Sequence, residues 1–163
     1  MSPALPLDHI RSWDDARVWR NSLEGRLVFT NGVFDLLHPG HIDVLLGARA
    51  CGDALIVGIN SDDSVRRLKG PERPVRAAAE RAYVLAALAM VDCVTVFAQD
   101  TPRELIQFLE PDVIVKGGDY DPTTVVGAAE TRARGGQVVI IPLTPGHSTT
   151  ATIAKLRTGS SDV

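Results

Sequence analysis

The stretch LVFTNGVFDLLHPGH, residues 27–41, decides the fold of this chain. It begins with an apolar, β-branched run typical of a buried strand. Gly32 then permits a tight turn, and Pro39 and Gly40 mark the start of a helix, because proline is favoured in the first helical turn. The stretch therefore predicts a strand that passes through a short loop into a helix.

The rest of the chain repeats this alternation. Short β-branched runs predict strands at residues 26–30, 54–60, 93–97, 112–116 and 137–142. Segments of helical period predict helices at about residues 41–50, 77–90, 102–109, 125–134 and 149–157. Because several strands are apolar almost throughout, we expect a parallel sheet with helices on both faces. The sequence predicts an α/β fold, a three-layer sandwich around a five-stranded parallel sheet.

Composition excludes several classes of protein. The chain has 163 residues, of which 45% are hydrophobic and 23% charged, as expected for one globular domain with its own core. A net charge of -3 lacks the basic surplus typical of nucleic-acid-binding proteins. The longest apolar run, residues 82–91, is too short to span a membrane, and no secretory signal is recognisable. We expect a cytoplasmic protein with neither nucleic acid nor membrane as a partner.

The two cysteines and the two ends of the chain have simpler interpretations. Cys51 and Cys93 lie outside any C-x-x-C and are expected to be small buried hydrophobic residues. Residues 1–25 predict an amphipathic helical extension that packs on the domain or on a neighbouring subunit, with Trp13 and Trp19 at its interface. Residues 26–158 form the predicted domain, and residues 159–163 a polar, frayed tail.

Two histidines follow the first strand. In an open parallel sheet, ligands bind beyond the carboxyl ends of the strands. His38 and His41 are three residues apart at a helix start, so they lie on one face and can grip one anion together. Zinc ligation and a packing role stay open as alternatives, although no third zinc ligand lies nearby. The glycine pattern is not G-x-G-x-x-G, which argues against a dinucleotide enzyme.

Two later segments are further candidates for phosphate or nucleotide binding. Ser148, Thr149 and Thr150 precede the last amphipathic segment and predict a second anion-binding helix start, with a simple N-cap as the alternative. The run KGGD at residues 116–119 follows a strand, and its glycines would let a base lie against bare backbone. An ordinary turn is the alternative for that run.

Two charged residues complete the set of candidate site residues. Lys69 lies in a glycine- and proline-bounded loop, residues 66–74, which is expected to be flexible enough to reach a phosphate. Asp35 is expected to organise the first loop by accepting backbone N–H bonds, rather than to act as a base.

These motifs carry a family resemblance. Residues 32–35 and 38–41 match the G-x-F-D and H-x-G-H signature of the cytidylyltransferase-like nucleotidyltransferases, and residues 148–150 resemble the second phosphate motif of that superfamily. The similarity extends from about residue 27 to residue 157. More narrowly, the chain resembles the adenylyltransferases that make ADP-heptose, through the segments TNGVFD (30–35), LKG (68–70), RPV (73–75), VD (91–92) and VKGGDY (115–120).

The resemblance implies a Rossmann-like fold of the nucleotidyltransferase type and a reaction. A phosphate oxygen of a sugar 1-phosphate, D-glycero-β-D-manno-heptose 1-phosphate, would attack the α-phosphorus of ATP and release pyrophosphate, giving ADP-heptose for lipopolysaccharide or surface glycans. Mg²⁺ is expected to arrive with ATP, and no metal site made by protein alone is expected. The resemblance further implies a homodimer. Because many relatives are fused to a sugar kinase and this sequence has no room for one, a separate heptose kinase is expected to supply the acceptor.

The resemblance also assigns roles to residues. His38, His41 and Lys69 are expected to be catalytic: the imidazoles donate to the α-phosphate region, and the lysine reaches the triphosphate or the sugar phosphate. Arg81 is expected to approach the triphosphate, with a surface ion pair to Glu80 or Asp92 as the alternative. The other residues expected to bind nucleotide or phosphate are Thr30, Asn31, Gly32, Phe34, Asp35, Gly40, Lys116, Gly117, Asp119, Ser148, Thr149 and Thr150.

Two other functions compete with this interpretation. A glycerol-3-phosphate cytidylyltransferase would share both phosphate motifs, and the segments at 68–70 and 116–120 favour the heptose enzyme by resemblance. A nucleotide sensor without catalysis would use the same fold, since a fold alone does not decide function. The histidine pair, Lys69 and residues 148–150 favour an active enzyme, because a silent relative has no reason to keep all of them.

Overall fold

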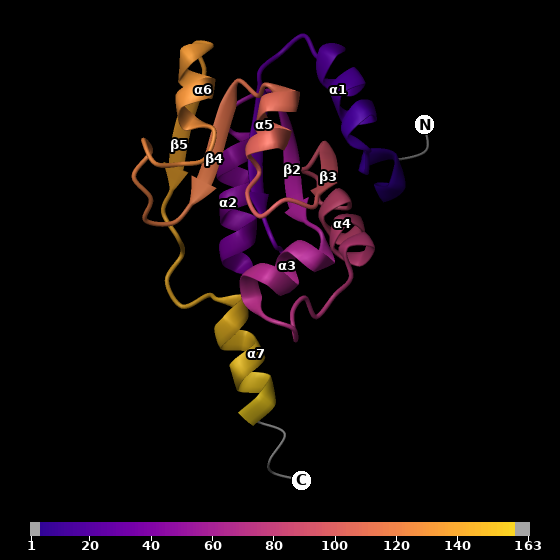
Figure 1. Ribbon diagram of the computed structural model, residues 1–163, viewed down its shortest axis with the longest axis vertical. Coiled ribbons are helices and arrows are strands. Elements are labelled where there is room, and N and C mark those ends of the chain that lie inside the picture. Colours follow the sequence, from indigo (N-terminus) through magenta and orange to yellow (C-terminus); the bar gives the residue numbers. More distant parts are fainter. Residues whose placement is uncertain (1–3, 159–163) are drawn as a thin grey trace.

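The computed structural model describes residues 4–158. A five-stranded sheet in the order β3-β2-β1-β4-β5 forms its centre, and every paired strand is parallel (Figure 1). The strands are β1 (Leu27–Gly32), β2 (Ala54–Asn60), β3 (Cys93–Phe97), β4 (Val113–Gly117) and β5 (Gln137–Ile141). The chain runs outward from β1 to β3 and then returns to β4, so the strand order reverses beside β1. Such a reversal opens a crevice at the carboxyl ends of the strands.

Helices alternate with these strands along the chain. They are a 3₁₀ helix η1 (Pro6–His9), α1 (Trp13–Asn21), α2 (Pro39–Arg49), α3 (Asp62–Lys69), α4 (Ala78–Ala86), α5 (Arg103–Leu109), α6 (Ala128–Ala133) and α7 (Thr149–Thr158). The predicted α/β sandwich with a five-stranded parallel sheet is confirmed.

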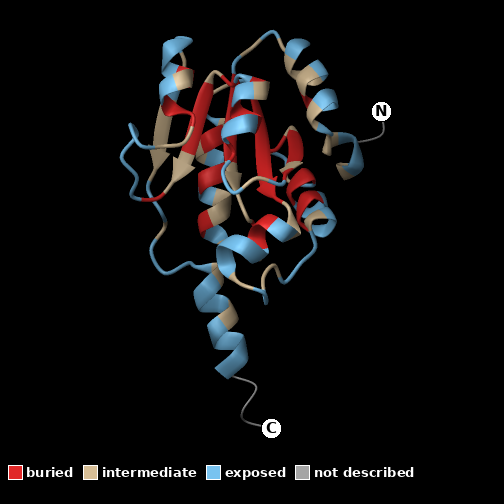
Figure 2. Ribbon diagram, in the orientation of Figure 1, coloured by how far each residue is buried: buried red, intermediate tan, exposed pale blue. Residues whose placement is uncertain are grey.

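The core lies on both faces of the sheet, because the strands are apolar on both. Val28, Leu55 and Val57 point to the face that packs against Leu45 of α2 and Leu85 of α4. The alternate strand positions pack against α1 and α5 on the opposite face, through a second cluster that includes Leu27, Phe29, Ile56, Leu105, Ile106 and Leu109. Figure 2 shows this buried centre in red. Side chains in a strand alternate between the two faces, so apolar runs such as β2 fill both layers of the core.

The N-terminal segment packs on the domain of its own chain. The indole of Trp13 donates to the carbonyl oxygen of Val96 at 2.8 Å, and its ring lies 5.7 Å from that of Phe108. Trp19 packs against the same core cluster. Of the two arrangements expected for residues 1–25, the described part, residues 4–25, shows the packing on its own domain. The predicted tail at 159–163 lies outside the described residues.

Two local predictions are wrong. Residues 66–69 belong to α3 and not to a loop, because Ser61 caps a helix at Asp62 by accepting a hydrogen bond from the Ser64 N–H at 3.2 Å. The helix expected at 77–90 ends at Ala86 and is followed by turns. Cys93 is buried as expected, whereas Cys51 is only half-buried.

Candidate active site

The two histidines lie at the start of α2 and hold each other. His38 is the N-cap residue, and its Nδ1 atom accepts a hydrogen bond from the backbone N–H of His41 at 3.4 Å. In return, Nδ1 of His41 accepts from the backbone N–H of His38 at 3.3 Å. The rings stack with centroids 3.8 Å apart. Because Nδ1 of each ring accepts, a neutral imidazole carries its proton on Nε2, where it is available to a ligand.

The surroundings keep both imidazoles neutral near pH 7. Burial, followed by the nearby His38, lowers the pKa of His41 to about 4. Burial also lowers the pKa of His38, and His147 contributes. Phe34 supports the pair: its ring lies 5.2 Å from that of His41, and its backbone adopts a left-handed φ of 49°. A left-handed non-glycine residue is uncommon and often marks a functional loop.

A cavity of about 420 Å³ opens at the carboxyl ends of β1 and β4, where the strand order reverses. Its floor is the end of β1 with the start of α2, and the start of α7 lies beside it. The structure brings to this cavity every predicted site residue except Arg81 and Asp119. The predicted residues that line the cavity are Thr30, Asn31, Gly32, Phe34, Asp35, His38, Gly40, His41, Lys69, Lys116, Gly117, Ser148, Thr149 and Thr150.

The start of α7 joins the cavity through side-chain contacts. The hydroxyl of Thr149 donates to the carbonyl oxygen of Leu36 at 3.0 Å, which ties α7 to the loop before α2. The hydroxyl of Ser148 accepts from the N–H of Ala151 at 3.3 Å, as an N-cap does. Two helix starts, each a source of unpaired N–H groups and positive potential, therefore face one cavity.

Asp35 fixes a loop, but not its own. The buried carboxylate accepts from the N–H groups of Val75 and Arg76, each at 2.9 Å, and pairs with Arg73 at 2.8 Å. These contacts hold the pKa of Asp35 below its usual range against the opposing effect of burial, which is the largest single influence. The expectation that Asp35 organises the first loop is therefore corrected, because its partners lie in the segment between α3 and α4.

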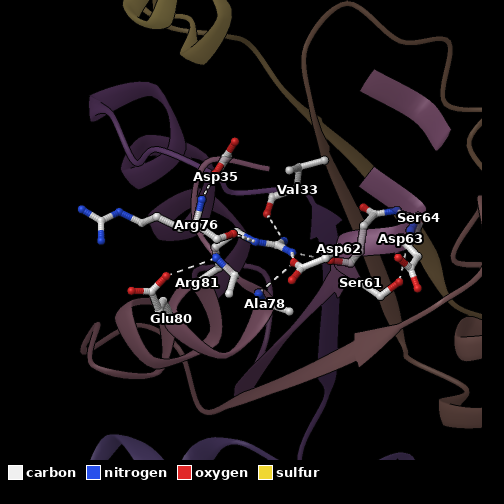
Figure 3. A network of polar contacts seen from close by, with 12 residues as sticks. Val33, Asp35, Ser61, Asp62, Asp63, Ser64, Arg76, Ala78, Glu80 and Arg81 are labelled. Atoms are coloured by element: carbon white, nitrogen blue, oxygen red, sulfur yellow. Dashed lines mark hydrogen bonds and ion pairs between the residues drawn. The ribbon is translucent and has the colours of Figure 1, made fainter. Parts of the chain in front are cut away.

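Arg81 lies beneath the cavity. Its side chain is 1% exposed and donates to the carbonyl oxygens of Val33, Asn60 and Arg76 and to the carboxylate of Asp62, all within 2.9 Å (Figure 3). Neither expectation for Arg81 is met: it does not line the cavity, and its buried guanidinium pairs with the partly buried Asp62 and not with Glu80 or Asp92. Asp119 is exposed and also lies outside the cavity lining.

The three cations of the cavity come from different places in the chain. Lys69 is the last residue of α3, and Arg73 follows it in the loop that Asp35 holds. Both line the neighbouring hollow as well, together with Thr150. Lys116 lies at the end of β4, where its Nζ atom donates to Oδ1 of Asn31 at 3.2 Å and lies 5.8 Å from the ring centre of Tyr120.

A model of cytidylyltransferase-like proteins matches residues 29–155, a range that contains the cavity residues described above. The chain belongs to this family. The predicted nucleotidyltransferase is thereby confirmed at the level of the family.

Named relatives and solved structures agree with this assignment. Proteins called bifunctional protein HldE from Acidiphilium cryptum and Geotalea uraniireducens are each 58% identical to this chain, over 132 and 135 residues. The matched part is 81% and 83% of this chain but only 27% and 28% of theirs, so the chain spans little more than a quarter of these relatives. The lipopolysaccharide core biosynthesis protein from Thermoplasma volcanium superposes with a TM-score of 0.60 at 26% identity, over 74% of this chain and 97% of its own.

A more distant structure shares the fold alone. A pantoate-β-alanine ligase from Francisella tularensis superposes with a TM-score of 0.61 at 16% identity, over 87% of this chain and 69% of its own. The cytidylyltransferase-like chain thus uses an architecture that also hosts other chemistry, which is why the side chains of the cavity must carry the functional argument.

Two basic residues of the cavity lining of this cytidylyltransferase-like chain were not among the predicted site residues. His147 lies next to His38, with ring centroids 5.9 Å apart, and Arg73 reaches the cavity rim. Arg73 stands in the segment RPV, which the resemblance singled out, so a signal was present. His147 belongs to no motif, and only the position of the α7 start reveals it.

Two further observations on residues 4–158 concern metal ions and membranes. His, Cys, Asp and Glu side chains of that range do not gather in groups of three or more suited to a metal ion. Over the same range, no helix is both long and apolar enough to cross a membrane.

Proposed function

We propose that this protein transfers AMP from ATP to a sugar 1-phosphate and releases pyrophosphate. The acceptor that we favour is D-glycero-β-D-manno-heptose 1-phosphate, so that the product is ADP-heptose for lipopolysaccharide or another surface glycan. One observation supports the proposal most strongly: a stacked pair of neutral imidazoles and two helix starts face the same cavity.

The proposed reaction needs stabilisation of charge more than it needs a base. A phosphate monoester is largely ionised at neutral pH, so its oxygen attacks without prior deprotonation. The barrier then falls through alignment and through hydrogen bonds that strengthen as negative charge builds on the transferred group. Nε2–H of His38 and His41 supplies such donors at the α2 start, next to the expected position of the α-phosphorus.

The rest of the triphosphate would follow the cavity toward α7. There the N–H groups and hydroxyls of Ser148, Thr149 and Thr150 suit the β- and γ-phosphates. Lys69 and Arg73 lie on the same side, since both share a hollow with Thr150. ATP would enter as its magnesium complex, and these two side chains would offset the remaining negative charge.

The choice of acceptor rests on likeness. The relatives named HldE are 58% identical, and a protein named for lipopolysaccharide core biosynthesis shares the fold at 26% identity over nearly its whole length. The segments LKG and VKGGDY resemble those of ADP-heptose-forming adenylyltransferases.

A matrix of two nucleotides and two acceptors tests the proposal. Purified protein is incubated with ATP or CTP and with heptose 1-phosphate or glycerol 3-phosphate, and pyrophosphate release is measured. We expect ATP with heptose 1-phosphate to give the highest kcat/KM. A preference for CTP with glycerol 3-phosphate would replace this function with the cytidylyltransferase alternative. ATP binding without pyrophosphate release from any pair would indicate a sensor.

A further inference from the structure

Lys116 is a cavity cation whose charge is not paired with a carboxylate within residues 4–158. Its side chain is half-buried at the end of β4 and lines the cavity. Its Nζ atom donates to the neutral amide of Asn31 and faces the ring of Tyr120. Among residues 4–158, the ion pairs of the structure do not include Lys116. Burial lowers the pKa of this amine, so an anionic ligand beside it would restore its usual preference for the charged form.

Lys116 also lies apart from the other two cations of the cavity. Lys69 and Arg73 come from the segment that follows β2, and Lys116 from the end of β4. The central strand β1 pairs with β2 on one side and with β4 on the other. The cavity therefore has one cationic side next to the α7 start and another at β4, with the end of β1 between the strands from which they come.

The geometry of phosphoryl transfer gives these two sides different ligands. The attacking and leaving oxygens lie roughly in line, on opposite sides of the phosphorus. If pyrophosphate leaves toward α7, Lys69 and Arg73, the attacking oxygen must approach from the β4 side. The cation at that side is then next to the incoming phosphate monoester and not next to the β- and γ-phosphates.

We propose that Lys116, held by Asn31, binds the phosphate group of the acceptor. This inference rests on the proposed nucleotidyl transfer and changes one expectation from the sequence, which placed Lys116 with the nucleotide. The ligand class is a sugar or polyol phosphate monoester. Its dianionic group would complete the hydrogen bonds of the ammonium group, of which Asn31 takes one.

Replacing the charge of Lys116 distinguishes a role in binding the acceptor from a role in binding ATP. We expect Lys116→Met to raise the KM for heptose 1-phosphate by about 10- to 100-fold, the usual effect of losing one charged hydrogen bond. The KM for ATP should change by less than about 2-fold, and calorimetry should show ATP binding without acceptor at unchanged affinity. Asn31→Ala keeps the charge but frees the amine, so a smaller increase in the acceptor KM is expected.

Lys155→Met is the matched control, because Lys155 is exposed on α7 and does not line the cavity. It should leave both KM values unchanged. Retained ATP binding shows that each variant is folded. An unchanged acceptor KM in Lys116→Met, or an ATP KM that rises as much as the acceptor KM, would overturn the inference.

The outcome is separable from that of the proposed function. If the wild-type protein prefers CTP and glycerol 3-phosphate, the heptose assignment fails, and the same split in KM is then measured with glycerol 3-phosphate. A selective rise in that KM still supports Lys116 as the acceptor-phosphate ligand. A wild-type protein that transfers to no phosphate monoester overturns both proposals.

Discussion

At His38 and His41, the backbone decides which nitrogen of each ring carries the proton. The backbone N–H of each histidine donates to Nδ1 of the other ring, so the two residues fix each other's tautomer and leave Nε2–H as the free donor of two rings that line the cavity. The spacing of three residues, visible in the sequence, is what makes this reciprocity possible at a helix start. The chemistry of the site depends on this small geometric feature.

His41→Ala should lower kcat for pyrophosphate release by about 100- to 1000-fold, the usual cost of one donor to developing charge. The fold should survive, because the ring is only half-buried. His9→Ala is the control, since that imidazole lies outside the cavity, and its Nδ1–H donates to the carbonyl oxygen of Asp92. Wild-type turnover by His41→Ala would refute the role of the histidine pair.

The lowered pKa of His41 also predicts a dependence of stability on pH. Its pKa is about 4 in the folded protein and 6.5 for an ordinary histidine. Between these values the unfolded chain binds a proton that the folded chain does not, so the free energy of unfolding falls as pH decreases from about 6.5. We expect the melting temperature to fall from pH 7 to pH 5, and to fall less in His41→Gln. Equal decreases in the two proteins, measured by circular dichroism, would contradict this.

At the scale of elements, Arg81 connects three segments through hydrogen bonds. Its guanidinium joins the loop after β1 at Val33, the end of β2 at Asn60 and the start of α3 at Asp62, while it belongs to α4 itself. The loop between β1 and α2, which leads to the histidines, is thus held at Val33 by an arginine that does not line the cavity. Positioning of the loop, and not contact with phosphate, is the role that these contacts support.

Arg81→Met should lower the free energy of unfolding by about 3–5 kcal/mol, because the Asp62 carboxylate loses its cationic partner and the carbonyl oxygen of buried Asn60 loses its side-chain donor. The control is Arg66→Met in α3, whose ion pair with Asp63 is exposed and should contribute less than about 1 kcal/mol. Urea unfolding measures both. If Arg81→Met does not fold, Arg81→Lys should still be less stable than wild type. A stable Arg81→Met with weakened ATP binding would instead restore the direct role in phosphate binding.

The elements also show where sequence reasoning succeeds and where it stops. Short β-branched runs predicted the five strands, since strands that are apolar on both faces are distinctive in a sequence. Helix α3 was missed because only Ser64 and Val65 of it are buried, although Ser61 and two following aspartates are a good start signal. Arg81 was misplaced because a charge in a sequence does not reveal that four oxygens surround it. His147 reaches the site only through the placement of α7.

Across the whole molecule, the cavity and the contacts of the N-terminal segment are at different places. The cavity lies at the carboxyl ends of β1 and β4, whereas α1 packs against α5 and β3, away from the residues that line it. The N-terminal segment therefore completes the second core cluster without touching the ligand site. Its contribution should be visible in stability and not in substrate affinity.

Trp13→Ala tests this separation. Loss of the half-buried ring and its bond to Val96 should lower the free energy of unfolding by about 2 kcal/mol, somewhat below the range for fully buried aromatic residues. The KM values for both substrates should stay unchanged. Val18→Ala, at a position 70% exposed on the same helix, should change stability by less than about 0.5 kcal/mol. A change in KM caused by Trp13→Ala would contradict the separation.

Helix α7 stands away from the body (Figure 1), and none of its residues, 149–158, is buried. A helix of ten residues with so little packing gains little stability from the core. Its stability therefore depends on what binds at its first turn. Under the proposed function, occupancy of the cavity by a triphosphate would act as the missing tertiary contact. The backbone amides of α7 should then exchange with deuterium quickly in the free protein and markedly more slowly with ATP bound. This helix would therefore report on nucleotide binding.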